Sequence, residues 1–432
     1  MSWRLRAALG GLAIASLAAT PGSRVANAAS AGLPGYDVSY EVRVGRDCIA
    51  DVRILVEKNP ERLRELRIRT DPARHYDFAG DGKIARDGDV VVWSLPPGRG
   101  ELRYRVRIEH RKGKGYDAYC DEKWALFRGE DLFPPTATVV VPEGTPSRAR
   151  LRIELPAEWK VVTPFRKRKD GSFKIEQPHR DHDRPTGWIL AGKLGVNREE
   201  VAGVRLTVAS PIGQNVHRLD LLALLRWTLP ELRETAGELP GHLLVVSARD
   251  PMWRGGLSGP DSLYLHADRP LIQRDGTSPL LHEVLHVLMS ARAGNDGDWV
   301  VEGLAEYYSL VLLQRTKTIS GDRYRKSLEK IEHEGADVGN LRVPHSTGKT
   351  TARAADVLHK LDQHVREKTG DQKNLDDVLR ALVATDVPIT TEGFRQTAEK
   401  ATGLDLAPFF RDNVPDGTAP AAPAPPQPTA TR

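Results

Sequence analysis

The sequence predicts an α+β protein of several domains, because its hydrophobic period changes along the 432 residues. From Tyr36 to about Ser210, apolar and polar residues alternate, which is typical of strands with one buried face. The pattern then mixes helix and strand, and after Val311 apolar residues recur at three- and four-residue intervals, as in helices. We therefore expect a β-rich domain at 29–213, an α+β domain at 214–316 and a helical domain at 317–415.

The β-rich domain is predicted by runs of strict alternation at 36–44, 101–108, 149–155 and 204–208. Each run has one apolar and one charged face, which suits an antiparallel β-sandwich or a saddle-like sheet.

The α+β domain is expected to begin with a helix at 219–229 that ends at Pro230, since proline disrupts a helix interior. Buried strands at 242–246 and 261–266 follow, and a helix is predicted at 279–292. The helical domain is predicted to contain helices at 322–334, 351–368, 375–383 and 391–401.

Both ends of the chain differ in composition from the middle. Arg4 and Arg6 precede an apolar run, and Ala26-Asn27-Ala28 supplies small residues for cleavage, so residues 1–28 are predicted to be a signal peptide cleaved after Ala28. We expect a periplasmic or secreted protein with no membrane span, because the apolar run is too short to cross a bilayer. Residues 416–432, rich in Pro and Ala, are predicted to be a disordered tail.

The basic pI of 9.1 is weak evidence for a nucleic-acid partner, and we predict none. Removal of the signal peptide takes away three basic residues and no acidic ones, which lowers the net charge from +5 to +2. The basic run 166–169 is interpreted as a solvated turn. His179 and His182 are interpreted as part of an exposed loop rather than a second metal site. Oligomeric state stays open.

Two cysteines remain, Cys48 and Cys120. In an oxidising compartment such a pair most often forms a disulfide, which would close a loop of about 70 residues and stabilise the fold by about 4 kcal/mol in the chain-entropy model. Two unpaired buried thiols are the alternative.

His282 and His286 are four residues apart on the predicted helix 279–292, so their imidazoles project from one face and can reach one ion. Glu283 lies next to the first histidine and can reach a water on that ion, where metal-assisted hydrolysis needs a general base. Short patterns of this kind also arise by chance, and a solvated helix face is the alternative.

A third ligand is predicted on the following helix. With Asp298 as its cap, this helix places Glu302 about 4.5 Å from its start, so a short antiparallel return brings Glu302 beside the two histidines. Glu306, one turn further, faces the same way and can hydrogen-bond a ligand imidazole. Gly303 would cost a helix interior about 1 kcal/mol, which predicts that the two helices pack closely there.

At these residues the sequence resembles the gluzincin metallopeptidases, the group of thermolysin, aminopeptidase N and the glycyl aminopeptidases. There, the two histidines of H-E-x-x-H and a glutamate in an N/S-E-G-F/L-A context bind one zinc, and Val301-Glu302-Gly303-Leu304-Ala305 matches that context. The resemblance implies one Zn²⁺ per chain on His282, His286 and Glu302, and a thermolysin-like catalytic domain at 214–316. The metzincins are excluded, because they need Gly and His where this chain has Met289 and Arg292.

Two departures from the group concern substrate contacts. Aminopeptidases of the group usually carry Gly-x-Met-Glu-Asn, whose glutamate anchors the substrate amine. The corresponding residues 255–262 lack this motif, and Asp261 is the candidate to anchor the amine in its place. The alternative is that Asp261 only forms a turn. Relatives also place a tyrosine, which stabilises the oxyanion, where this chain has Thr351. The candidates to replace this tyrosine are His345, Tyr324 and Tyr264. Tyr264 lies on the predicted edge strand and is also a candidate for substrate binding. A structural role is the alternative for each of the three.

Two functions follow from these residues. The first is an exported zinc metallopeptidase that hydrolyses peptide or protein substrates with a zinc-bound water activated by Glu283. The second is a zinc-binding but catalytically weak protein that binds peptides or envelope components on the same scaffold. The departures favour the second function, and the intact Glu283 favours the first. Endopeptidase and aminopeptidase action both remain open.

Overall fold

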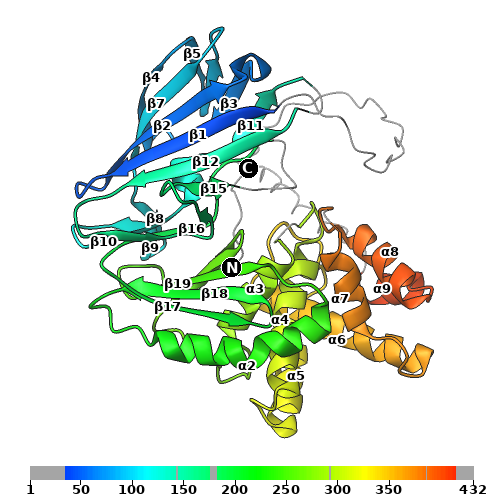
Figure 1. Cartoon of the computed structure of the whole chain (residues 1–432). Helices are drawn as coiled ribbons and strands as arrows, with labels where there is room; N and C mark the ends of the chain where they lie inside the picture. Colours follow the sequence, from blue (N-terminus) through cyan, green and yellow to red (C-terminus); the bar gives the residue numbers. More distant parts are fainter. Residues whose placement is uncertain (1–34, 143–144, 176–181, 291–292, 386, 415–432) are drawn as a thin grey trace, which may run out of the picture.

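The computed structural model describes residues 35–142, 145–175, 182–290, 293–385 and 387–414. The predicted signal peptide, the predicted tail and His179 lie outside these residues. Figure 1 shows β-sheets in the upper part of the molecule, a further sheet below them, and helices packed beneath and beside that sheet. The prediction of an α+β protein with a β-rich N-terminal part is confirmed.

The largest sheet of the N-terminal part has seven strands in the order β14-β15-β12-β1-β2-β7-β4. Alternation in β1 buries every second side chain from Tyr36 to Val44, as its sequence predicts. Most neighbours run antiparallel, but β1 pairs with β12 in parallel. The bounds are β1 (Tyr36–Val44), β2 (Ile49–Lys58), β4 (His75–Gly80), β7 (Gly100–Arg107), β12 (Ser147–Glu154), β14 (Arg166–Lys167) and β15 (Phe173–Ile175).

Two smaller sheets complete the N-terminal part. One contains β11 (Thr136–Val140), β3 (Glu65–Arg69), β6 (Val90–Ser94) and β5 (Lys83–Asp87), with a short 3-10 helix, η1 (Pro60–Arg62), before β3. The other contains β13 (Lys160–Val162), β16 (Trp188–Gly192), β10 (Trp124–Arg128), β9 (Gly115–Cys120) and β8 (His110–Lys112), with the short helix α1 (Gly129–Leu132) after β10. Their inner faces share one apolar core with the seven-stranded sheet.

The disulfide joins two of these sheets. Cys48, just before β2, is bonded to Cys120 at the end of β9, with the Cα atoms 5.5 Å apart. The bond closes a loop across 72 positions and ties the seven-stranded sheet to the sheet that contains β10 and β16.

The lower sheet has the order β17-β18-β19-β21-β20. Its strands are β17 (Leu194–Val201), β18 (Val204–Pro211), β19 (His242–Ala248), β20 (Gly256–Gly259) and β21 (Ser262–His266). Sheet pairing therefore divides the chain near residue 193, earlier than the boundary expected at 213. Alternation alone could not show this, because β18 alternates like the preceding strands yet pairs in parallel with β19.

Both faces of this sheet are covered. One face packs on helices around Leu206, Leu243 and Val245, and the other packs on the sheet above through Trp188 and Leu244. This arrangement explains the apolar run in β19, which is buried on both sides.

The helix α2 (Arg218–Ala236) continues through Pro230, contrary to the prediction that it ends there. Proline removes one backbone hydrogen bond, but Leu229, Leu232 and Ala236 are buried against the sheet and keep the later turns helical.

The remaining helices form the lower right of Figure 1. They are α3 (Pro279–Leu288), α4 (Asp298–Arg315), α5 (Gly321–Gly335), α6 (Lys349–Thr369), α7 (Leu375–Val383), α8 (Thr391–Thr402) and α9 (Ala407–Asn413). No helix within the described ranges combines the length and apolar character needed to cross a membrane.

Two local predictions were wrong. Gly303 permits close packing of α4 on α6 rather than on α3, because a Cβ at Gly303 would lie 2.8 Å from the Cβ of Ala354. His182 is buried instead of lying in an exposed loop, and its ring nitrogens hydrogen-bond the hydroxyls of Tyr36 and Tyr40, each at 2.8 Å.

Candidate metal centre

The helix α3 begins where its sequence predicts. The Ser278 hydroxyl accepts a hydrogen bond from the Leu281 amide at 3.3 Å, and Pro279 occupies the first helical position. Most of the helix is apolar and buried, so the three polar residues of the H-E-x-x-H motif are held in the interior with it. His286 and Glu283 are buried, and His282 keeps a small exposed edge.

The helix α4 returns alongside α3 and brings a carboxylate to the two imidazoles. The Nε2 atoms of His282 and His286 lie 3.0 Å apart, and the Glu302 carboxylate oxygens lie 3.5 Å from the first and 3.6 Å from the second. One ligand atom from each residue lies within 4.8 Å of the others. The packing of α4 against α3 brings these residues together.

Glu306 sets the orientation of one imidazole. Its Oε2 lies 3.0 Å from Nδ1 of His282, and a carboxylate only accepts, so His282 donates from Nδ1 and leaves its Nε2 lone pair facing the other two side chains. Burial disfavours a charged His282, but the hydrogen bonds and charges of Glu302 and Glu306 outweigh it and raise the pKa of His282 to about 10. The centre thus attracts positive charge strongly.

These residues fit a zinc ion. Ligand atoms about 2.0 Å from a tetrahedral zinc lie about 3.3 Å from one another, which is close to the separations of 3.0 to 3.6 Å found here. Glu302 Oε1 is buried and has no hydrogen-bond partner in the described part of the chain, a costly state that a bound cation would relieve. Two neutral imidazoles and one carboxylate leave the fourth tetrahedral position open.

Glu283 lies between this centre and the edge strand β20. Its Oε2 is buried without a hydrogen-bond partner among the described residues, and its other oxygen faces Gly256, where an added Cβ would lie only 2.6 Å away. Gly256 is therefore the residue that leaves room for the carboxylate. A buried carboxylate with a free oxygen can accept a proton from a water within hydrogen-bonding distance of that oxygen.

The edge strand presents free backbone groups at the same place. The amide of His266 donates to the carbonyl of Gly255 at 2.9 Å, which makes this pair a hydrogen-bonded pair of the β20–β21 ladder. Because hydrogen-bonded and non-bonded pairs alternate along an antiparallel ladder, the amides and carbonyls of Gly256 and Ser258 point away from β21. An extended peptide can add to this edge as a further strand.

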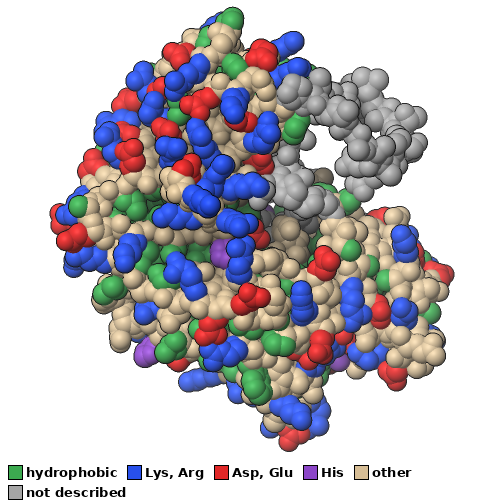
Figure 2. All heavy atoms as spheres, in the orientation of Figure 1, with side chains coloured by type: hydrophobic (Ala, Val, Ile, Leu, Met, Phe, Trp, Pro, Cys, Tyr) green, Lys and Arg blue, Asp and Glu red, His purple; other side chains and the backbone are tan. Residues whose placement is uncertain are grey.

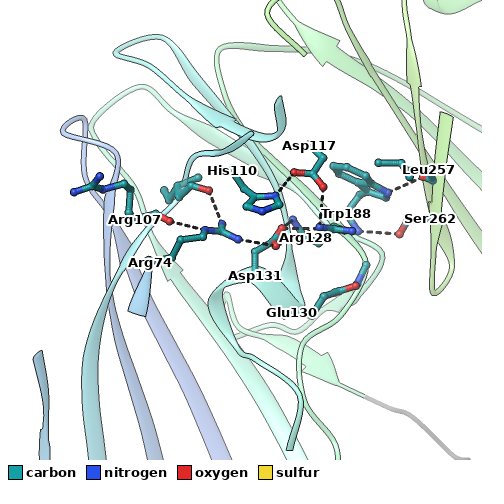
Figure 3. A network of polar contacts seen from close by, with 12 residues as sticks. Arg74, Arg107, His110, Asp117, Arg128, Glu130, Asp131, Trp188, Leu257 and Ser262 are labelled. Atoms are coloured by element: carbon teal, nitrogen blue, oxygen red, sulfur yellow. Dashed lines mark hydrogen bonds and ion pairs between the residues drawn. The ribbon is translucent and has the colours of Figure 1, made fainter. Parts of the chain in front are cut away.

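The sheet that contains β16 contacts β20 through Trp188. Trp188 donates from its indole nitrogen to the carbonyl of Leu257 at 2.9 Å, and its own amide donates to the Ser262 hydroxyl at 2.9 Å. Figure 3 shows these contacts beside a buried network of charged groups.

That network holds the neighbouring strand β10 in place. Arg128 lies 3.3 Å from Asp131 and 3.4 Å from Asp117, and Arg74 lies 3.2 Å from Asp131. Burial alone would raise the pKa of Asp131, but the two guanidinium groups outweigh it and hold the pKa well below its usual range. Asp131 is therefore ionised and paired with both guanidinium groups, which ties the end of β10 to Arg74.

A cavity of 420 Å³ lies over the candidate centre. Its wall includes His282, Glu283, Glu302 and Glu306 together with Gly256 of β20 and Gly255 just before that strand. Both signs of charge line it: Lys330 lies 3.6 Å from Asp275 and 3.3 Å from Glu334, while Arg254 and Arg269 lie elsewhere on the wall. The edge strand, the carboxylate base and the three ligand groups thus open into one space.

The four other candidates lie outside the described lining of this cavity. Asp261 forms the turn between β20 and β21 with φ of 49°, as the structural alternative predicts. Tyr264 is buried, and its hydroxyl donates to the carbonyl of Trp253 at 3.0 Å. Tyr324 packs against the helical core, and His345 is exposed in the segment before α6.

Sequence reasoning missed Ser346. It lines the cavity, and its buried hydroxyl has no hydrogen-bond partner among the described residues, while its amide donates to Asp298 at the start of α4. Thr351, the residue at the position of the tyrosine in relatives, also lines the cavity. Serines in loops are common, so the sequence carried no signal for this one.

Comparison with solved structures identifies the fold, whereas the two sequence comparisons find no match. No family model matches the chain, and no curated protein matches it. An aminopeptidase N family protein from Idiomarina loihiensis superposes with a TM-score of 0.68 at 16% identity, over 87% of this chain and 76% of that one. The M1 zinc metallopeptidase from Deinococcus radiodurans superposes with a TM-score of 0.58 at 17% identity, over 93% and 96% of the two chains.

This chain has the M1 zinc metallopeptidase fold. The resemblance stated from the motif is confirmed at the level of the fold, over most of the chain rather than at the metal segment alone. A mutant of the Deinococcus radiodurans M1 enzyme, solved with a Tyr-Ser-Ala substrate bound, superposes with a TM-score of 0.61 at 16% identity, over 90% and 95% of the two chains.

Proposed function

We propose that the chain is an exported zinc metallopeptidase that binds one Zn²⁺ through His282, His286 and Glu302. The observation that carries the proposal is that these ligand atoms converge beside a buried carboxylate, Glu283, which itself faces the edge strand β20. A structural zinc site closes its fourth position with a protein ligand and has no use for a carboxylate there.

The residues of this chain take separate parts in hydrolysis. Zinc, when bound, supplies a Lewis acid that polarises a carbonyl and lowers the pKa of water. The free amides and carbonyls of Gly256 and Ser258 bind the substrate backbone as an added strand. Glu283 accepts a proton from the attacking water and returns it to the leaving amine, so no net proton is consumed.

The residues predicted to donate a hydrogen bond to the oxyanion, His345, Tyr324 and Tyr264, lie outside the described lining of the cavity. We propose the Ser346 hydroxyl, because it lines the cavity and its buried oxygen lacks a partner within the described residues. It would share the developing negative charge with the metal.

The substrate class follows from the edge strand. Backbone recognition favours peptides in extended form, and the relative from Deinococcus radiodurans was solved with a tripeptide. We propose peptide or protein substrates met in the periplasm or outside the cell, since residues 1–28 have the composition of a signal peptide.

Replacement of Glu283 by glutamine tests the assigned roles. The substitution keeps the shape of the side chain and removes its basicity, so we expect peptide hydrolysis to fall by a factor of about 10² to 10⁴ while zinc stays near one per chain. Zinc content is measured by mass spectrometry on the purified protein, and hydrolysis on a mixed peptide library. Loss of zinc together with activity would contradict the division between ligands and base.

The second candidate is a zinc-binding protein that binds peptides with little turnover. The observation in its favour is Thr351, since a tyrosine donor is missing from the cavity wall at that position. Digestion of the peptide library with and without a chelator separates the two functions. Absence of any chelator-sensitive cleavage, with peptide binding retained, would support the second.

A further inference from the structure

A second cavity lies where the N-terminal sheets meet the lower sheet. It has a volume of 580 Å³ and is lined by β14, by β17 and β18, and by His242 at the start of β19. Along β19, His242 lies about 17 Å from Ser247, the residue level with Leu265 and Gly256 next to the metal centre. The two cavities are therefore separate.

Four cationic side chains line this second cavity: Arg166, Lys167, Arg198 and Arg205. All four are exposed, and within the described residues none of them forms an ion pair. Figure 2 shows Lys and Arg side chains gathered on this face, between the upper sheets and the strands of the lower sheet. Residues 166 and 167 form β14 rather than the solvated turn expected for them, which holds their side chains at the cavity wall.

The acidic side chains of the lining do not neutralise these cations. Both oxygens of Glu199 hydrogen-bond Arg226, which lies outside the lining, at 2.5 and 3.0 Å. Glu200 is the register partner of Arg205 in the β17–β18 pair. Among the described lining residues, Glu200 is the one acidic side chain left to balance the four positive charges. The cavity thus carries an excess of positive charge.

The strand geometry makes the cations converge. Arg198 and Glu200 lie on one face of β17, and Arg205 lies on the same face of β18, since its register partner is Glu200. Nearer the other end of these strands, the sheet that contains β16 packs on the same face of the lower sheet. The cavity lies where that packing ends. β14, from the upper part, supplies Arg166 and Lys167 from the other side.

The inner wall is apolar and includes Val162, Phe173 and Leu206. His242 donates from Nδ1 to the carbonyl of Pro164 at 2.8 Å, which closes one end. An apolar wall excludes water and strengthens charge interactions at the rim. Arginine forks match the oxygens of phosphate groups with two parallel hydrogen bonds.

We propose that this cavity binds a compact anion that carries two or more phosphate groups. Several cations around a space of this volume match the high charge density of an oligophosphate better than that of a single carboxylate. The phosphates can belong to a soluble oligophosphate or to the headgroup of a phospholipid that carries two phosphates, such as cardiolipin, and the site makes the same contacts with either.

Titration calorimetry with inorganic tripolyphosphate tests the proposal on the full chain after signal-peptide removal. We expect saturable binding that weakens as the salt concentration rises. Salt screens the attraction between the phosphates and the exposed cations, and the screening length is about 8 Å at physiological ionic strength. The variant R198Q/R205Q should bind at least about tenfold more weakly, because it loses two charge-assisted contacts. The surface variant K167Q should weaken binding less and keeps the proposal testable if the double variant does not fold.

The matched control is R103Q/R107Q, which removes two arginines of β7 outside the cavity lining and changes the net charge equally. Its affinity should stay within about twofold of the unsubstituted protein, because its loss of charge is remote and screened. Equal weakening by the control, no tripolyphosphate binding, or equally tight binding of hexaglutamate would overturn the proposal.

Two further experiments identify the source of the phosphates and test whether this cavity binds them independently of the metal centre. Flotation with cardiolipin vesicles, in which each headgroup carries two phosphates, supports a headgroup if R198Q/R205Q abolishes it, and binding of tripolyphosphate without flotation supports a soluble ligand. Binding should persist in the E283Q variant and after chelation, because the cavity shares no lining residue with the metal centre among those described. Loss of binding on chelation would overturn the assignment to this cavity.

Discussion

Replacement of Gly256 by alanine should disable hydrolysis without disturbing the metal. The added Cβ would lie 2.6 Å from Oε1 and 2.8 Å from Cγ of Glu283, whereas ordinary contacts begin at 3.4 Å. The buried carboxylate must therefore move by about 1 Å, and misplacement of a reacting group by that distance costs about 10²-fold in rate. This factor corresponds to about 3 kcal/mol of activation free energy.

The assay is steady-state hydrolysis of the best-cleaved peptide of the library, with zinc content measured on the same sample. We expect kcat to fall about 10²-fold with zinc unchanged, since Glu283 is not a ligand. Gly259→Ala is the matched control on the same strand, because its Cβ would meet its nearest atom, the Cα of Gly187, at 3.3 Å, a much smaller overlap than at Gly256. Full activity of the Gly256→Ala variant, or an equal loss in the control, would refute the proposed placement of the base.

Three further substitutions probe other parts of the structure. Glu306→Ala removes the acceptor on Nδ1 of His282 and should weaken zinc binding by about 10- to 100-fold, measured by chelator competition; unchanged affinity would contradict its role. Ser346→Ala should lower kcat by about 10²-fold with KM and zinc little changed if its hydroxyl stabilises the oxyanion, and a proportionate change in KM alone would argue against that. Burial lowers the pKa of His182 to about 4, so the unfolded state binds more protons between about pH 6.5 and pH 4, and the free energy of unfolding should fall by up to about 3 kcal/mol as pH drops through that window. Urea unfolding at several pH values checks this, and an equally steep fall in a His182→Gln variant would exclude His182 as the cause.

The convergence of His282, His286 and Glu302 could be predicted because the geometry is set locally. Histidines four residues apart share a helix face whatever surrounds the helix, and a short return limits where Glu302 can lie. Its hydrogen-bonding partner Glu306 follows from the same period, one turn further along α4. The alternation of the N-terminal strands was predictable for a similar reason, since every second side chain of a strand faces the core.

The features that the sequence did not predict depend on contacts between distant segments. Gly303 marks close packing correctly, but its neighbour Ala354 is 51 positions away and no local pattern indicates it. Pro230 ends helices in general, and only the burial of the residues after it keeps α2 continuous. Ser346 gained its place in the cavity because α6 docks on α4, which brings the loop before α6 to the metal centre.

The strands β17 and β18, which precede residue 214, belong to the lower sheet. A fragment that began at residue 214 would lack β17 and β18, which form one side of the lower sheet, and Trp188, which holds the carbonyl of Leu257. β20 would then keep its pairing with β21 and its packing on α3 but lose the hydrogen bond from Trp188, and an edge strand with fewer contacts opens more easily. Because Glu283 packs directly on Gly256 of that strand, movement of β20 would displace the base as well as the groups that bind substrate. The N-terminal sheets therefore support the strand against which the proposed general base packs.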